Sequence, residues 1–250
     1  MVVLWLGAAY GLVAAWLAVL LERRVLDGSP MSAPPRCDHC AHALPRWAQL
    51  PVVGWIRPAR CAACGEVASR APVWPAIAAV ASAMVIVAAG MPWLMTATWL
   101  LLTPIGVALA AIDLSVQRLP DVLTLPAALV AVLLLGVWAI TDGGSVITIV
   151  ASAVGLCAAY LVMHLVTRGG MGMGDVKLAL ALGALLGALG VAAVIVATML
   201  AFILGGLASA VLLLRRRASR GATIPFGPFM LIGAVATLPL GNPVLALLGL

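Results

Sequence analysis

The sequence predicts an all-α, polytopic membrane protein with about eight transmembrane helices and a small loop domain after the first helix. Of its 250 residues, 65% are hydrophobic and 9% are charged, whereas a soluble domain is nearer half apolar and a quarter charged. The apolar residues form long, nearly uncharged runs rather than short alternating segments, which favours a helical bundle over a β-barrel. The basic residues fall only in every second connection between these runs.

The first apolar run, residues 2–21, is long enough to cross a bilayer. No basic residue precedes it, whereas Glu22, Arg23 and Arg24 follow it. A secretory signal peptide has the opposite polarity, with positive charge ahead of a shorter apolar core. We therefore expect a retained first helix whose N-terminus lies outside the cytoplasm.

Seven further apolar segments follow a polar loop that runs from Asp27 to about Pro72. They cover residues 73–90, 93–112, 122–140, 146–166, 176–189, 191–214 and 226–250. The segment that begins at residue 176 is short for a full span. Residues 187–190 fit either a tight turn or a packing surface of small residues, so seven helices is the alternative to eight.

The distribution of positive charge decides between these two counts. With eight helices and the N-terminus outside, residues 22–72, 113–121, 167–177 and 215–225 face the cytoplasm. These segments contain all fourteen basic residues: Arg23, Arg24, Arg36, Arg46, Arg57, Arg60, Arg70, Arg118, Arg168, Lys177, Arg215, Arg216, Arg217 and Arg220. Cytoplasmic connections are generally enriched in Lys and Arg, whereas seven helices would place the last cluster outside.

This layout divides the chain into a first transmembrane helix (1–22), a cytoplasmic loop domain (23–72) and a membrane domain (73–250). The net charge of +6 follows from the topology, so it does not indicate a nucleic-acid partner. The expected surroundings are the lipid bilayer.

Four cysteines in the loop have the spacing of a metal site. Two residues separate Cys37 from Cys40, and two residues separate Cys61 from Cys64, with twenty residues between the pairs. This spacing is typical of paired zinc knuckles. Four thiolates would complete a tetrahedral shell around Zn²⁺, so the site would be structural. Redox-active or unpaired thiols are the alternative. Stable disulfides are not expected, because they are rare in the cytoplasm.

Two carboxylates lie at the ends of apolar runs on the predicted cytoplasmic side. Asp113 ends one run, and Asp175 follows a stretch with four glycines at residues 169–174. Peptide hydrolysis suits a carboxylate pair, because one ionised group can take a proton from water while a protonated one polarises the scissile carbonyl. Two carboxyl groups close together cannot both ionise easily, so one stays protonated while the other is ionised. We therefore predict that Asp113 and Asp175 meet as an aspartyl-protease pair.

Each of these acidic residues also has a structural interpretation when it is considered alone. Asp175 and Asp121 could cap the N-termini of the helices that follow them. Asp113 could instead pair with Arg118. His164, within an apolar segment, fits a hydrogen-bonded interior group or a neighbour of the active site.

The surrounding motifs resemble those of the type IV prepilin peptidase (leader peptidase) family. The similar blocks are residues 112–126, the GxGD block at 172–178, the segment 224–229, and the four-cysteine loop with residues 44–45 and 50–55. The resemblance implies that Asp113 and Asp175 are the catalytic aspartates of a GxGD intramembrane protease. It also implies cleavage of short basic leaders from pilin-like or pseudopilin precursors, at the cytoplasmic face of a bacterial inner membrane.

A second group of residues is expected to position the substrate or the backbone at this site. Glycines let two backbones approach closely, and a proline restrains the start of a helix. The expected positioning residues are Gly172, Gly174, Lys177, Pro225 and Gly227.

Larger members of the family also N-methylate the new N-terminus with S-adenosylmethionine. This chain departs from their pattern, because residues 11–16 lack the usual polar Ser and Asn and Pro75 stands where a glutamate is expected. The sequence leaves methyl transfer open. Two other classes are also compatible with the pattern: a transporter or proton-relay protein that uses the same carboxylates, and a zinc-stapled membrane scaffold without catalysis.

Overall fold

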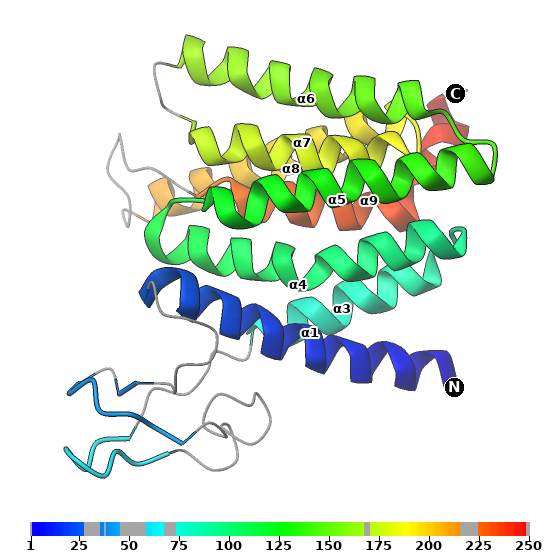
Figure 1. Cartoon of the computed structure of the whole chain (residues 1–250). Coiled ribbons are helices and arrows are strands. Elements are labelled where there is room, and N and C mark those ends of the chain that lie inside the picture. The colour runs from blue at the N-terminus through cyan, green and yellow to red at the C-terminus, as the bar shows by residue number, and fades with distance from the viewer. Residues whose placement is uncertain are drawn as a thin grey trace. The chain divides into compact units, whose positions relative to one another are not determined.

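The computed structural model describes residues 2–27, 36–37, 39–45, 59–67, 74–167, 171–215 and 225–248 (Figure 1). Eight helices form almost all of this part, and apart from two isolated β-bridges it contains no strand. The helices are α1 (Val2–Asp27), α3 (Trp74–Ala88), α4 (Trp93–Val116), α5 (Asp121–Thr141), α6 (Val146–Val166), α7 (Met173–Gly187), α8 (Val191–Leu214) and α9 (Gly227–Leu248). The predicted all-α fold with eight helices is confirmed.

Two helix boundaries near the predicted site differ from the expected ones. Helix α4 continues to Val116 instead of ending at residue 112, so Asp113 lies inside its last turn. Helix α7 begins at Met173, with Gly172 at the N-cap, so Asp175 lies in the first turn and is not the cap. Both helices extend beyond their apolar runs because backbone hydrogen bonding, not hydropathy, decides where a helix ends.

Four helices, α4, α5, α6 and α8, are long and apolar enough to cross a membrane. Shorter apolar helical segments are Ala9–Leu21, Trp74–Ala88 and Gly227–Pro239, counted over the residues that the structure describes. Many large apolar side chains on these helices are exposed, among them Ile147, Val166 and Leu214. Apolar surface of this extent fits lipid and not water, so the protein is an integral membrane protein.

The chain divides into two compact units. The first unit contains Met1–Met84 and Thr103–Ala108, and the second contains Val85–Leu102 and Leu109–Leu250. The core of the first unit is built from small side chains: Ala14, Ala15, Ala18, Ala76, Ala79, Val107 and Ala108. A Cβ at Gly11 would lie 2.5 Å from the Val80 Cα, so α1 and α3 pack almost backbone to backbone, as small residues permit.

Helix α7 is the buried element of the second unit. It contacts α5, α6, α8 and α9, and α5 and α6 flank it in Figure 1. Gly183 and Gly187 face α6, where an added Cβ would lie 2.6 Å from the Ser152 carbonyl oxygen or from the Ser152 Cβ. The turn after α7 contains Gly190 at φ 115°. The predicted turn and the predicted small-residue packing surface are therefore both present, one after the other.

Candidate active site

Asp113 is held in place by the start of α9. Its side chain is only 5% exposed, and its Oδ2 accepts a hydrogen bond of 3.0 Å from the backbone N–H of Gly227. The expected alternative, a pair with Arg118, is not what the structure shows. The Asp113 carbonyl also accepts the N–H of Gln117, whose left-handed conformation ends α4. The chain then turns directly towards Leu119 and α5.

Asp175 occupies an equivalent environment at the start of α7. Its side chain is 6% exposed, and its carboxylate lies against Gly172, where an added Cβ would be 3.3 Å from the Oδ2 and where the backbone N–H stabilises the negative charge. The first turn of a helix favours negative charge, because free N–H groups and the helix dipole point at it. Asp113 and Asp175 interact electrostatically, although 62 positions separate them in the sequence. The structure therefore brings the two predicted carboxylates together.

Leu119 packs between the start of α7, which carries Asp175, and the start of α9, which donates a hydrogen bond to Asp113. A Cβ added at Gly174 would lie 2.6 Å from the Leu119 Cβ, and one added at Gly227 would lie 3.6 Å from the Leu119 Cδ1. The same Gly227 Cβ would approach the Asp113 Oδ2 to 2.8 Å. Gly174 and Gly227 are therefore required for close approach. The three sequence blocks around residues 113, 175 and 227 converge on one small volume.

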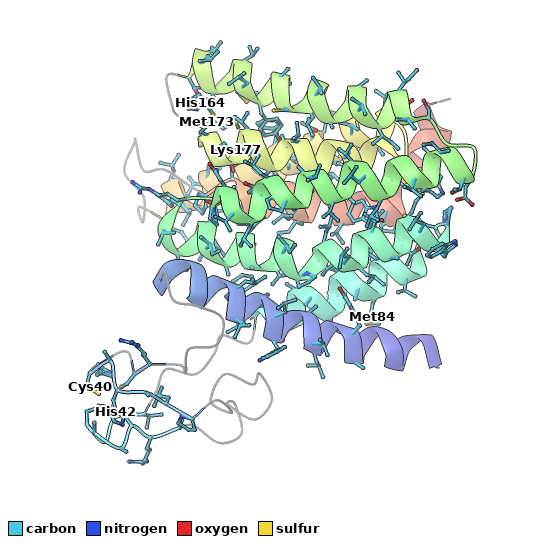
Figure 2. All side chains as sticks on the ribbon, in the orientation of Figure 1. Cys40, His42, Met84, His164, Met173 and Lys177 are labelled. Carbon is cyan, nitrogen blue, oxygen red and sulfur yellow. The ribbon has the colours of Figure 1, made fainter. Side chains whose placement is uncertain are left out.

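An ion pair joins the starts of α5 and α7 next to this volume. Lys177 Nζ lies 2.6 Å from the Asp121 Oδ1, with side chains 32% and 56% exposed. Asp121 is the first residue of α5, with Pro120 at the N-cap. Its carboxylate therefore lies in the first turn of α5 and also pairs with Lys177 of α7. Pro225 lies half-buried immediately before α9. In Figure 2, Lys177 and Met173 lie at the same end of the helices as His164.

His164 contacts the backbone just ahead of α7. Its Nδ1 lies 2.7 Å from the Met171 carbonyl oxygen. The side chain is half-buried, not fully interior. The hydrogen-bonded interpretation of this histidine and the neighbour-of-the-site interpretation are therefore both supported.

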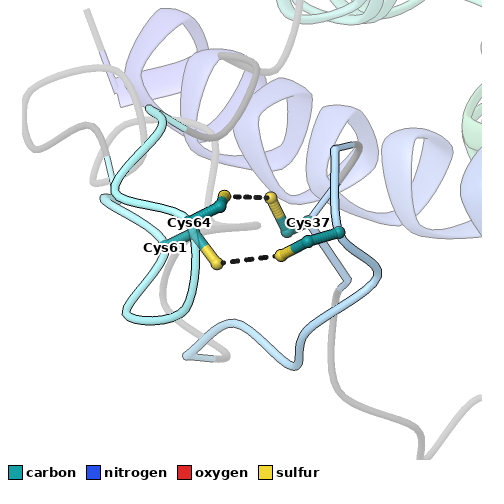
Figure 3. Close-up of side chains that lie close together, drawn as sticks. Cys37, Cys61 and Cys64 are labelled. Atoms are coloured by element: carbon teal, nitrogen blue, oxygen red, sulfur yellow. Dashed lines mark hydrogen bonds between the residues drawn. The ribbon is translucent and has the colours of Figure 1, made fainter.

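The four cysteines of the loop also come together, in a separate cluster. Their sulfur atoms all lie within 4.8 Å of one another, with Cys37 and Cys64 3.7 Å apart and Cys40 and Cys61 3.4 Å apart (Figure 3). These distances are too long for disulfides, whose sulfurs lie about 2.05 Å apart. A tetrahedral zinc site with Zn–S bonds of about 2.3 Å requires sulfurs about 3.8 Å apart. The cluster could therefore hold a metal ion.

Each cysteine pair lies in the same type of backbone turn. In both turns the first cysteine donates its N–H to the carbonyl five residues later, and the residue four positions later donates back. The bonds run from Cys37 to His42, Ala41 to Cys37, Cys61 to Glu66 and Gly65 to Cys61, each at 2.9 Å. The backbone amides of Cys64 and Ala63 lower the pKa of Cys61 to about 6, whereas burial and the neighbouring sulfurs raise the pKa of Cys64 and Cys40. Amides aimed at a sulfur favour the thiolate, which is the form that binds metal.

Comparison with known proteins places this geometry in a family. The model of the type IV leader peptidase family matches residues 100–210, and that of the bacterial peptidase A24 N-terminal domain matches residues 9–89. A prepilin leader peptidase/N-methyltransferase of Burkholderia pseudomallei (strain 1026b) is 33% identical over 258 aligned residues, which cover 94% of this chain and 79% of the relative. The chain belongs to the type IV leader peptidase family.

Other relatives with the same name have similar sequence identity to this chain. The protein from Pseudomonas aeruginosa is 33% identical over 92% of this chain and 81% of its own length. That from Stutzerimonas stutzeri is 32% identical over 84% of this chain and 73% of its own length. No solved structure matches the chain. Membership of the leader peptidase family confirms the expected enzyme class, a peptidase, over a transporter or a non-catalytic scaffold.

One feature of this leader peptidase was not foreseen from the sequence. Tyr160, buried on α6, stacks near Phe202 and Phe226 at ring-centroid distances of 6.0 and 6.2 Å, and it interacts electrostatically with Asp175. Phe229 joins the same cluster. The chain has only three Phe and two Tyr. Phe226 and Phe229 lie in the segment 224–229, which was the available signal, whereas Tyr160 and Phe202 join them only through tertiary contacts.

The described contact between α1 and α3 does not fit S-adenosylmethionine. The cofactor carries a charged amino-acid group and a ribose, and both require polar partners when buried. In this contact, alanines pack against one another, Gly11 touches Val80, and Pro75 is fully buried. We therefore derive no methyl-transfer step from these residues. Residues 50–55 of the cysteine loop lie outside the described part of the chain.

Proposed function

We propose that this protein is an aspartic endopeptidase of the membrane whose catalytic residues are Asp113 and Asp175. The observation that carries the proposal is the electrostatic interaction of these two buried carboxyl groups, of which Asp113 accepts the Gly227 N–H and Asp175 lies against Gly172. Buried carboxylates without a cation partner are costly. A protein retains them where their chemistry is used.

The arrangement supports hydrolysis by an activated water. The ionised carboxylate of the pair takes a proton from water as the oxygen attacks the scissile carbonyl carbon, and the protonated partner donates to the carbonyl oxygen. The tetrahedral intermediate collapses when the amide nitrogen receives a proton and the C–N bond breaks. The two groups act as one titrating pair, so the acid and base roles belong to the dyad and not to a single residue.

The proposed substrates are precursors of pilin-like proteins or pseudopilins. The support is the name of the relatives, prepilin leader peptidase/N-methyltransferase, together with the placement of the dyad at the end of α4 and the start of α7. In the predicted topology these ends face the cytoplasm. Cleavage would then remove a short basic leader just before the apolar helix of the precursor, at the inner membrane of a bacterium.

The organisation predicted from the sequence is part of this proposal. Residues 1–22 form the first transmembrane helix, residues 23–72 the cytoplasmic cysteine domain, and residues 73–250 the peptidase domain. Cys37, Cys40, Cys61 and Cys64 would hold a structural Zn²⁺. The ion would supply folding energy to a loop that is too short to build its own core.

A cleavage assay tests the proposed function. The protein is co-expressed with a pilin precursor in a host that lacks its own prepilin peptidase, and the precursor mass is followed by mass spectrometry. We expect cleavage by the wild type and none by Asp113→Ala or Asp175→Ala. Asp142→Ala, an exposed carboxylate in a turn, is the matched control and should cleave normally. Cleavage that survives either dyad substitution would rule out the two-aspartate mechanism. A methyl group on the product would show in the same spectrum.

A further inference from the structure

His164, on α6, contacts the segment that precedes Asp175. The proposed chemistry does not use this side chain. Its Nδ1 lies 2.7 Å from the carbonyl oxygen of Met171. A carbonyl oxygen only accepts hydrogen bonds, so Nδ1 must carry the hydrogen. The tautomer is thus assigned from the partner.

The peptide unit that accepts this bond also donates one. The Met171 carbonyl and the Gly172 N–H belong to the same peptide, and the described residues contain no cis peptide bonds. In a trans peptide, C=O and N–H point in opposite directions. The Asp175 carboxylate lies close against Gly172 and interacts with its N–H, so one rigid plane lies between the imidazole and the candidate catalytic group.

Other contacts agree with this geometry. A Cβ added at Gly172 would lie 3.3 Å from the Asp175 Oδ2, which places the carboxylate close against this peptide. Gly172 has φ −66° and ψ 139°, and its own carbonyl is held by the N–H of Asp175 at 3.1 Å. The hydrogen bond between His164 and the Met171 carbonyl is a second restraint, and it acts on the peptide unit that contains the Gly172 N–H.

We propose that His164 is a positioning residue for Asp175, acting through the Met171–Gly172 peptide. The inference rests on the proposed function of Asp175. The imidazole fixes the rotation of the peptide plane and thereby aims the Gly172 N–H at the carboxylate. It also polarises the peptide, because hydrogen bonds in a chain strengthen one another. Asp113 has no need of such a positioning residue, because the N–H that it accepts, that of Gly227, belongs to the first turn of α9.

Three substitutions separate this role from simple packing. In His164→Asn the side-chain amide nitrogen can occupy the place of Nδ1, whereas in His164→Gln it reaches the place of Nε2. His164→Leu removes the donor and keeps an apolar body. Leu165→Ala, an exposed neighbour on α6, is the matched control. The assay uses the purified full-length protein in detergent with a purified pilin precursor.

Loss of one hydrogen bond to the site should lower kcat by about tenfold in His164→Leu, with KM changed by less than about twofold. His164→Asn should recover most of kcat, and His164→Gln should not. Hydrogen exchange at the Gly172 amide should be faster in the Leu and Gln variants than in the wild type. Leu165→Ala should match the wild type. If His164→Leu does not fold, the comparison of Asn with Gln decides.

Full kcat in His164→Leu, or equal kcat in the Asn and Gln variants, would overturn the inference. The failure of the proposed function is distinguishable. Cleavage that persists in Asp175→Ala would refute the dyad and this inference together. Loss of cleavage in Asp175→Ala with full activity of His164→Leu would refute only the role of His164.

Discussion

Each candidate catalytic carboxylate lies against one glycine. Gly227 donates its N–H to Asp113, and the Asp175 carboxylate lies against Gly172. The glycines matter for space as well as for the donor, because an added Cβ at Gly227 would lie 2.8 Å from the Asp113 Oδ2. No side chain fits at that distance unless the carboxylate moves. The position of Asp113 is thus set by the backbone of α9, and that of Asp175 by the N-cap of its own helix, α7.

Gly227→Ala should therefore reduce cleavage while leaving the fold intact. The carboxylate of Asp113 must rotate away from the Gly227 N–H, and the lost hydrogen bond alone should lower kcat by about tenfold or more. Gly206→Ala is the control, because an added Cβ there meets no atom within 4 Å. Cleavage kinetics of the two purified variants check the prediction. Equal kcat in both would show that Gly227 does not shape the site.

The sequence predicted the identity of the acids better than their surroundings. Asp113 and Asp175 could be selected because carboxylates are scarce in a chain with eight acidic residues, and their motifs are specific. The contacts of His164 with Met171 and of Tyr160 with Phe226 are tertiary. They depend on how α6 rotates against α7 and α9, and a single sequence does not determine that rotation. The alternative role of Asp175 as an N-cap is wrong by three residues, since Gly172 is the N-cap and Asp175 lies in the first turn.

At the scale of helices, the second unit is organised around α7. The helix has only fifteen residues, yet most of its side chains are buried, because α5, α6, α8 and α9 surround it. Its apolar sequence predicted a membrane segment, and its small residues predicted close packing. The register of Gly183 and Gly187 against Ser152 followed only from the structure.

Gly183→Leu should separate α6 from α7. The Cβ would lie 2.6 Å from the Ser152 carbonyl oxygen and 2.7 Å from the Ala153 Cα, and backbone cannot move aside as a flexible side chain can. Overpacking of this type costs about 1–3 kcal/mol. We expect a lower thermal midpoint in detergent and reduced cleavage. Gly155→Leu, on α6 with no atom within 4 Å of an added Cβ, should have a midpoint close to that of the wild type. Equal midpoints for both variants would contradict the packing.

For the whole molecule, metal content is the most direct test of the loop domain. We expect about one zinc per chain in protein purified without chelator, because the four sulfurs lie within 4.8 Å of one another and four thiolates can complete the shell of a structural zinc. Cys37→Ser or Cys61→Ser should lose the metal, and Cys157→Ser, outside the cluster, should keep it. Elemental analysis of the purified variants gives the ratio. Absence of zinc from wild-type protein would refute the structural site.

Membrane topology is the second property at this scale. The sorting of basic residues predicts that Arg118 faces the cytoplasm and that Asp142 faces the other side. A membrane-impermeant maleimide added to intact cells should label Asp142→Cys but not Arg118→Cys, and both should react after lysis. The parent protein gives the background from its native cysteines. Labelling of Arg118→Cys in intact cells would invert the topology and remove the proposed cytoplasmic cleavage site.

The central claim is that Asp113 and Asp175 act together as one catalytic pair. The most direct measurement is the rate of precursor cleavage by the purified protein, comparing wild type with Asp113→Asn, Asp175→Asn and Asp142→Asn. Asparagine keeps the size of the side chain but removes its acid–base chemistry. We expect no detectable cleavage by either dyad variant, with thermal stability unchanged. Asp142→Asn should cleave at the wild-type rate. Turnover by either dyad variant at a substantial fraction of the wild-type rate would rule out the catalytic pair.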